Sequence, residues 1–298
     1  MNRSLLAILA TVISAPAFAQ STSTSATTPA TTVSVPTAEV KSDVASKLSF
    51  TLAAETWVAA KDANRGDFEG SIEEERQGIN SYQYIGAGYD LGNSKSVQLR
   101  QYTTFQAASK TYNNENEYRG GDTVIRYQDK KSFTLGALPV ASQARIYMPL
   151  LSDARDTSIK VGEDNPLWTA RFYNSVSQSY GKLDLGFTLQ NRFYNREETN
   201  KGKETWRLYP IFEIGYNINP TVKPFANIYS VHQFYKTGGD TANADTFATD
   251  LGLEFNIGKN VNLLGYVTTE DNLRTGADSY DPTNEDQNTY EIDLYITL

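Results

Sequence analysis

The sequence contains no cysteine and only one histidine, His232, among its 298 residues. The chain therefore has no disulfide bonds, no thiol nucleophile and no cluster of His and Cys residues of the kind that binds zinc. No segment reaches 18 consecutive apolar residues, which excludes a membrane-spanning helix. A glycine-rich phosphate-binding loop is also missing, and we expect no cofactor and no metal. The fold must be stable without covalent or metal cross-links.

Basic residues are outnumbered by acidic ones, with 27 Lys and Arg against 35 Asp and Glu, for a formal net charge of -8. Proteins that bind nucleic acid usually present a strongly basic face. The charge balance therefore argues against nucleic acid as a partner.

The N-terminus has the features of an export signal. Arg3 precedes a short apolar run at 5–15 (LLAILATVISA), and Ala17-Phe18-Ala19 has the small-x-small pattern of a cleavage site. We predict a secretory signal peptide, 1–19, cleaved after Ala19. The Ser- and Thr-rich stretch that follows cannot bury enough apolar surface to fold, so 20–46 is predicted to be a disordered periplasmic lead-in. Its last part, 38–46, is expected to be further linker, with one helical turn or a small plug as the alternatives.

From residue 47 onward the hydrophobic pattern has a period of two, which is typical of β-strands. In 182–193, KLDLGFTLQNRF, Leu183 and Phe187 share one parity while Asp184 and Arg192 share the other. Such a strand has one apolar face and one polar face. Twelve candidate strands follow this pattern: 47–59, 80–92, 95–107, 122–137, 142–151, 166–180, 182–194, 204–217, 222–235, 246–257, 261–270 and 288–298.

The connections between these strands alternate in length. The short ones are 92–94, a corner at Pro139-Val140-Ala141, Gly181, 217–220 and 258–260. The long ones are 60–79, 108–121, 152–165, 195–203, 236–245 and 271–287. Short turns at one end, long loops at the other and an even strand number are the layout of an outer-membrane barrel.

Two strands have a disturbed pattern. In 122–137, Asp129, Lys130 and Lys131 interrupt the alternation, and we predict a β-bulge that resets the register. In 222–235 both faces are mixed. Pro210 and Pro224 are expected to remove hydrogen-bond donors within their strands.

The chain resembles the Gram-negative outer-membrane β-barrel proteins and is porin-like. The resemblance rests on the signal peptide, the rhythm of strands and loops, and the alternating last strand, 290–298 (YEIDLYITL). It implies an all-β fold, a transmembrane antiparallel up-and-down β-barrel of about 12 strands at 47–298, located in the cell outer membrane. The apolar face would contact lipid and lipopolysaccharide, and the outer-membrane assembly machinery would read the C-terminal strand. Family members most often end in Phe, whereas this chain ends in Leu298.

The polar face of each strand carries the candidate site residues. The predicted pore-lining basic residues are Arg100, Arg126, Arg145, Arg171, Arg192 and Arg207. The predicted pore-lining acidic residues are Glu55, Asp90, Asp250, Glu254, Glu270, Glu291 and Asp293. Because the last strand pairs with the first in a barrel, the arginines are expected on one wall and the acids on the facing wall. Asp184 and Glu213 are exceptions within the basic wall. Interior tyrosines are expected at 84, 102, 147, 173 and 209, where they would stack with sugars or fill space.

Two interpretations of this interior remain. Opposed charged walls create a transverse field that orients and selects solutes, which implies a pore for small hydrophilic, charged or oligosaccharide-like molecules. Alternatively, the charges pair across the lumen and close it, leaving a structural or adhesive barrel that acts through its loops. Twelve strands lie between the eight that side chains fill and the 16–18 of open porins.

The acidic loops at 61–78 and 270–287 are either divalent-cation sites or a solvated acidic rim, and the absence of EF-hand spacing favours the rim. A hydrolase is the least favoured class. His232, in 230–235 (SVHQFY), has no neighbouring His-x-Ser-Asn-Gly pattern like that of the outer-membrane phospholipases, and no triad is recognisable. The sequence therefore predicts a channel rather than an enzyme.

Overall fold

The computed structural model describes residues 46–59, 79–106, 117–150, 167–195, 204–235, 246–272, 283 and 287–298. The predicted signal peptide, 1–19, and all but the last residue of the predicted lead-in, 20–46, lie outside the described residues. So do the predicted acidic loop 61–78 and most of 270–287. Within the described residues, no helix is long and apolar enough to cross a membrane.

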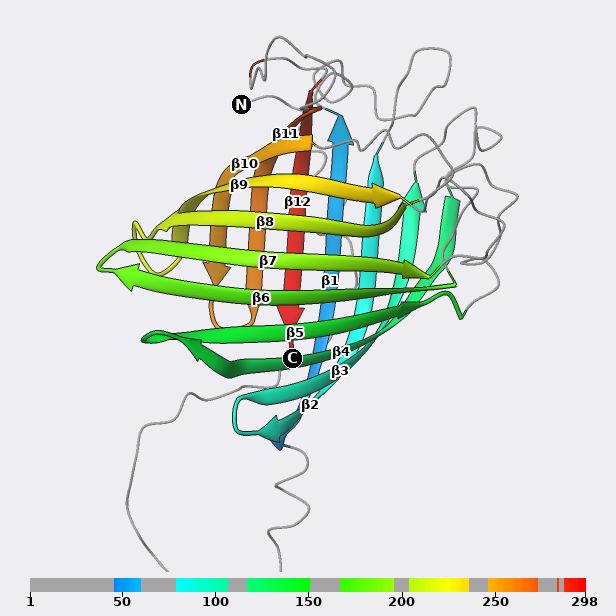
Figure 1. Ribbon diagram of the computed structural model, residues 1–298, viewed down its shortest axis with the longest axis horizontal. Helices are drawn as coiled ribbons and strands as arrows, with labels where there is room; N and C mark the ends of the chain where they lie inside the picture. The colour runs from blue at the N-terminus through cyan, green and yellow to red at the C-terminus, as the bar shows by residue number, and fades with distance from the viewer. Residues whose placement is uncertain are drawn as a thin grey trace, which may run out of the picture.

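The described chain forms twelve antiparallel strands that close into one barrel, in which each strand pairs with its neighbours in sequence (Figure 1). The strands are β1 (Leu48–Ala59), β2 (Asn80–Gly92), β3 (Lys95–Gln106), β4 (Glu117–Leu135), β5 (Leu138–Met148), β6 (Trp168–Tyr180), β7 (Leu183–Asn195), β8 (Glu204–Tyr216), β9 (Val222–Tyr235), β10 (Thr246–Ile257), β11 (Val261–Asn272) and β12 (Asn288–Thr297). The predicted all-β barrel and its strand number are confirmed.

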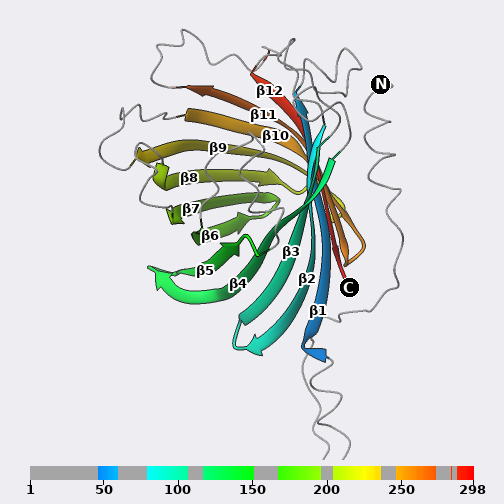
Figure 2. The same ribbon diagram turned by 90° about the vertical axis from the view of Figure 1, so that its right-hand side faces the viewer.

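The barrel is closed by β1 and β12, which pair in register from Thr51↔Thr297 to Ala59↔Thr289. Leu298 continues this closure, because its backbone N–H donates to Phe50 O (2.8 Å) and its carbonyl accepts from Phe50 N (3.1 Å). Strands on the near wall cross those on the far wall steeply in Figure 1, and Figure 2 shows the same arrangement from the side. Strongly tilted strands are what closure of a barrel requires.

The outer face of the barrel is apolar and exposed. Leu52 and Ile85 are direct partners on neighbouring strands, and Ile85 has 66% of its surface accessible. Phe50 and Phe212, with 51% and 56% accessible, lie on the same outer face. The opposite parity is polar, and it includes the buried side chains of Arg100 and Asp293. An apolar outer face and a charged interior are typical of a barrel that is surrounded by lipid.

All five short turns lie at one end of the barrel, which we call the short-turn end; the other end is the long-loop end. Gly92, Gly136, Gly181 and Gly258 have φ between 61° and 79° at four of these turns. This left-handed backbone conformation is readily adopted only by glycine, so these residues set where the hairpins reverse. The alternation of short and long connections is as predicted.

The predicted corner at Pro139-Val140-Ala141 is wrong. The chain reverses at Gly136 and Ala137, and Pro139 lies inside β5 as the direct partner of Thr134. The chain reverses at the glycine because the tight turn needs a positive φ, whereas proline is tolerated near the start of a strand. As a result β5 begins four residues earlier than expected and ends at Met148. Its partner β4 also begins earlier, at Glu117.

The predicted β-bulge in β4 is confirmed, since the register with β5 shifts between Asp129 and Phe133. Pro210 pairs with Leu189 of β7, while its ladder with β9 skips from Leu208 to Ile211. The proline therefore interrupts one ladder and leaves the other intact.

Candidate functional site

Five of the predicted arginines are direct cross-strand partners in one continuous row. The order is Arg126 on β4, Arg145 on β5, Arg171 on β6, Arg192 on β7 and Arg207 on β8. We call these five residues the arginine ladder. Directly opposed residues have Cβ atoms only about 4.5–5.5 Å apart, and like charges at this spacing are destabilising. A row of five therefore needs compensating contacts.

Tyrosines provide these contacts. The Arg171 guanidinium lies 4.1 Å from the centre of the Tyr147 ring, and the Arg145 guanidinium lies 4.7 Å from that of Tyr173. Arg192 lies 5.0 Å from the ring of Tyr209. These cation–π contacts place each cation against the negative face of a ring on a neighbouring strand. The ladder is thus an alternation of guanidinium groups and phenol rings.

A sequence signal for this arrangement is the tripeptide Arg-x-Tyr, because residues i and i+2 of a strand share a face. It occurs on five strands: 100–102 (RQY), 145–147 (RIY), 171–173 (RFY), 192–194 (RFY) and 207–209 (RLY). The hydroxyl of the tyrosine accepts from its own arginine at 100–102 (3.3 Å), 145–147 (3.4 Å), 192–194 (3.4 Å) and 207–209 (2.9 Å). These arginines and tyrosines were predicted separately, and Tyr194 was not among the predicted residues.

Arg100 and Arg126, at the β3–β4 side, bind glutamines. Arg126 Nη2 donates to Gln128 Oε1 (2.5 Å), and its Nε donates to Gln143 Oε1. Arg100 Nε donates to Gln98 Oε1 (2.7 Å), which Arg126 Nη1 also reaches (3.3 Å). Arg100 does not belong to the ladder, because its register partner on β4 is Val124, whereas the partner of Arg126 on β3 is Gln98.

The middle of the ladder has hydrogen-bond donors that the described protein atoms do not satisfy. The Nε atoms of Arg145, Arg171 and Arg192 are buried without a partner, as is Nε2 of Gln190. Gln190 has only 7% of its surface accessible. Most buried polar atoms in native proteins have a partner, so four orphaned donors on three adjacent strands are unusual.

The predicted acidic residues are arranged differently. Glu55 and Asp293 are direct partners on β1 and β12. Glu291 lies two residues before Asp293 on β12 and therefore faces the same side of the sheet. The Tyr266 hydroxyl lies 2.8 Å from Glu291 Oε2 and 3.0 Å from Asp293 Oδ2, and Tyr295 donates to Glu55 Oε1 (2.9 Å). We call Glu55, Asp250, Glu291 and Asp293 the acidic wall.

Asp250 completes this wall on β10. It accepts from Asn227 Nδ2 (3.1 Å), Thr268 Oγ1 (2.9 Å) and Tyr229 Oη (3.3 Å). The carboxylates are therefore held by neutral donors of the same wall.

The two walls do not neutralise each other. The ion pairs between described side chains are Lys95–Asp129 (4.0 Å) and Lys223–Glu254 (2.5 Å), and neither joins the ladder to the acidic wall. Glu254, predicted as part of the acidic wall, is instead paired with Lys223 on the neighbouring strand β9. For the described part of the chain, the interior is not a salt-bridged core.

The remaining predicted residues lie away from this centre. Asp90 is exposed at the short-turn end, where its carboxylate accepts from the backbone N–H of Gly92 (2.8 Å). Glu270 is exposed and pairs with Ala248, near the long-loop end of β11. Asp184 accepts from Ser179 (2.6 Å) and Asn217. Together these acids line the two mouths rather than the middle.

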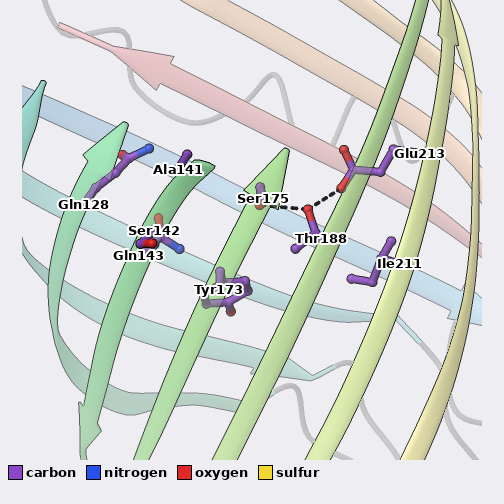
Figure 3. A pocket seen from close by; sticks show the side chains of 9 residues that line it. All are labelled: Gln128, Ala141, Ser142, Gln143, Tyr173, Ser175, Thr188, Ile211 and Glu213. Atoms are coloured by element: carbon purple, nitrogen blue, oxygen red, sulfur yellow. Dashed lines mark hydrogen bonds between the residues drawn. The ribbon is translucent and has the colours of Figure 1, made fainter. Parts of the chain in front are cut away.

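Two cavities border the ladder. One, of about 970 Å³, opens at the short-turn end, and its lining includes Arg126, Gln98, Asp90 and Leu298. The other, of about 300 Å³, lies beside the ladder and is lined by Gln128, Ala141, Ser142, Gln143, Tyr173, Ser175, Thr188, Ile211 and Glu213 (Figure 3). There Thr188 links Ser175 and Glu213 through hydrogen bonds of 2.8 Å each. The larger cavity reaches the ladder at Arg126, and the smaller one has no arginine of the ladder in its lining.

His232 lies outside this interior. Its register partner is Leu208, and that of Ser230 is Phe247, so both side chains are on the outer face of β9. Ser230 Oγ and His232 Nε2 are 3.0 Å apart. The neighbouring outer positions carry Trp206 and Phe234, whose stacked rings are 4.2 Å apart.

Comparison with known proteins shows the fold. No family model matches the sequence, and no curated protein is significantly similar to it. Among solved structures, an outer membrane channel from Pseudomonas putida F1 has a TM-score of 0.57 and 8% identity, over 85% of this chain and 96% of that chain. The KdgM porin (TM-score 0.40, 7% identity, 83% and 98% covered) and LpxR from Salmonella typhimurium (0.43, 10%, 83% and 99%) are more distant. The chain therefore has the fold of outer-membrane β-barrel proteins.

Proposed function

We propose that this protein is a channel of the outer membrane that admits small hydrophilic solutes and favours anions. The observation that carries this proposal is that the arginine ladder and the acidic wall face one interior without pairing across it. Charged walls in a narrow tube with low-dielectric surroundings focus the electric field and set ion selectivity. A lumen that was only structural would be expected to pair its buried charges, since an unpaired buried charge is costly.

The excess of unpaired donors on the ladder supports anions over cations. Carboxylates of the acidic wall accept hydrogen bonds from Tyr266, Tyr295, Asn227 and Thr268, which use up much of their capacity. The ladder keeps three orphaned donors, at Arg145, Arg171 and Arg192, against one orphaned acceptor on the acidic wall, Asp293 Oδ1. The fold shared with an outer membrane channel is consistent with this function.

The test is single-channel conductance of the refolded mature protein in a planar bilayer under a salt gradient. We expect discrete current steps with a reversal potential that favours anions. The double substitution Arg171→Glu and Arg192→Glu should shift the permeability ratio toward cations by about tenfold or more. Lys182→Glu is the matched control, since it makes the same kind of charge change at an exposed turn and should leave selectivity nearly unchanged.

Insertion without any conductance would contradict the channel. The protein would then be a structural or adhesive barrel whose long loops meet other surfaces.

A hydrolase is a second candidate because of the 3.0 Å contact between Ser230 and His232 on the outer face. Catalysis would also require a group that orients the histidine and donors for an oxyanion. If the protein is a channel alone, it will release no fatty acid from phospholipid vesicles. Release that disappears in both Ser230→Ala and His232→Ala would establish the hydrolase.

A further inference from the structure

We propose that the arginine ladder is a binding track for a linear acidic oligosaccharide, with successive carboxylates held by successive arginines. This inference rests on the proposed channel function and names its substrate class. It follows from the direction of the ladder, its spacing, the neutral residues beside it and its orphaned donors.

The ladder is inclined to the pore axis. Direct register partners lie on a line at right angles to the strands, and strands of outer-membrane barrels are tilted by about 35–45°. The line therefore climbs the wall at the same angle. Its five arginines span four strand spacings, about 19 Å, and rise about 12 Å through the pore. The lower end is Arg126, which lines the cavity at the short-turn end. The ladder is thus a track along the pore and not a ring around it.

The spacing of the ladder selects among linear anions. Neighbouring arginines are one strand spacing apart, about 4.8 Å. In an extended acidic peptide, side chains on one face recur about every 6.7 Å and adjacent residues about every 3.4 Å, so neither repeat matches. The charges of a polyphosphate chain are closer together still. A chain of hexuronate units carries one carboxylate on every sugar and places its charges further apart than a polyphosphate chain does.

A second row beside the ladder suits the rest of a sugar. Its members are also direct cross-strand partners, one inward position closer to the short-turn end: Gln128, Gln143, Tyr173, Gln190 and Tyr209. We call them the neutral row. Amide and phenol groups both donate and accept hydrogen bonds, as hydroxyl groups require. A charged row next to a neutral row matches a polymer with both carboxylates and hydroxyls.

The orphaned donors mark the stretch of wall where such a chain would bind. The Nε–H groups of Arg145, Arg171 and Arg192 and the amide nitrogen of Gln190 in the neutral row have no partner among the described residues, and because they are buried, a ligand reaches them once these side chains turn toward the lumen. Guanidinium groups bind carboxylates through paired, charge-assisted hydrogen bonds. The four donors lie together on β5, β6 and β7, midway along the track. The acidic wall, across the lumen, would repel a polyanion and hold it against the ladder.

The experiment measures block of the single-channel current by a linear β-1,4-mannuronate hexamer. The comparison probes are the mannuronate monomer, the neutral maltohexaose, hexaglutamate and hexametaphosphate hydrolysed to linear polyphosphate. We expect the mannuronate hexamer to block at concentrations at least about tenfold lower than any comparison probe, because one charge-assisted hydrogen bond corresponds to about a tenfold change in affinity. Affinity should rise with chain length and level off near five sugars, the number of arginines in the ladder.

Two variants distinguish specific binding of the hexamer to the ladder from a general effect of positive charge in the lumen. Arg171→Gln with Arg192→Gln should weaken block by the hexamer by about a hundredfold, taking about tenfold for each arginine. Gln190→Leu removes no charge, so it should weaken block by the hexamer several-fold through the loss of one hydrogen-bonding group. Lys223→Gln, a substitution of a lumenal cation outside the ladder, is the control.

The outcomes distinguish the two proposals. Binding of the hexamer to the detergent-refolded barrel is also measured by calorimetry, which does not depend on conductance. An anion-selective channel that is blocked equally by the hexamer and maltohexaose, or better by polyphosphate or hexaglutamate, overturns the oligosaccharide track and leaves the channel intact. Calorimetric binding of the hexamer without any current supports the track as a receptor site and overturns the channel.

Discussion

The two charged walls of the barrel differ in how their groups are satisfied. On the acidic wall, neutral hydroxyl and amide groups donate to the carboxylates, as Tyr295 does to Glu55, and the Tyr266 hydroxyl lies within hydrogen-bond distance of both Glu291 and Asp293. On the ladder, arginines rest against tyrosine rings, and three Nε donors remain unpaired. The acidic wall is a hydrogen-bond network in which one oxygen, Asp293 Oδ1, is buried without a partner among the described residues, and such networks rigidify a structure. The ladder resembles a surface prepared for a ligand.

The two sides of the barrel also differ in the space they leave for a side chain at an inner glycine. Gly252, on the inner face of the acidic side, leaves no room for a side chain, because a Cβ would meet the Gly265 carbonyl oxygen at 2.5 Å and Tyr266 Cβ at 2.4 Å. A Cβ at Gly186, on the inner face of β7, would meet the Glu213 carboxylate at 2.9 Å and Glu213 Cβ at 3.2 Å, but no backbone atom. The position on the acidic side is therefore the tighter of the two.

The largest effect should come from filling the tight position. Gly252→Ala is expected to lower the free energy of unfolding by about 1–3 kcal/mol, because backbone atoms on β11 would have to shift. Gly186→Ala should cost less, since the nearest atoms belong to the movable Glu213 carboxylate and Glu213 Cβ, at 3.2 Å, has to shift only slightly. Urea titration of the folded barrel in detergent, followed by the heat-dependent shift on a gel, measures both. Equal losses in the two variants would mean that the walls are packed alike.

A second, smaller effect should separate the roles of tyrosine on the two walls. Tyr266→Phe removes the hydroxyl between Glu291 and Asp293 and is expected to cost about 1–2 kcal/mol of stability, because buried carboxylates lose a donor. Tyr147→Phe keeps the ring under Arg171 and loses only a 3.4 Å hydrogen bond with Arg145, so it should cost below about 1 kcal/mol. The same urea titration compares them. A larger loss in Tyr147→Phe would show that the ladder depends on hydroxyl groups after all.

The smallest effect should come from anions that occupy the ladder. Sulfate that binds the folded barrel adds about 0.4 kcal/mol to the free energy of unfolding when its concentration equals its Kd. Sulfate also stabilises proteins in general, so the readout is the difference between the wild type and Arg171→Gln with Arg192→Gln. The wild type should gain more stability than this variant between equal concentrations of chloride and sulfate. An equal gain in stability from sulfate in both proteins would show that sulfate does not bind at Arg171 and Arg192.

Much of the fold and part of the site could be predicted from the sequence. The period of two, the turn glycines and the alternating connection lengths predict strands close to the observed ones. Parity also predicts which arginines and acids share the inner face. The turn at Gly136 was misplaced because Pro139 was given more weight than the glycine. Pairing of Glu254 with Lys223 was missed because it depends on the register between β9 and β10.

The sequence by itself determined the strands, their two faces and the grouping of charges on opposite sides of the barrel, because these depend on residue order and on the fixed alternation of side chains along a strand. Only the tertiary structure decided that five arginines lie in one row. Their alignment depends on the register of four strand pairs, and a register is set jointly by turn geometry and by irregularities such as the bulge between Asp129 and Phe133. A shift of the register by two residues in any of these four strand pairs would have kept every arginine on the inner face but would have broken the ladder.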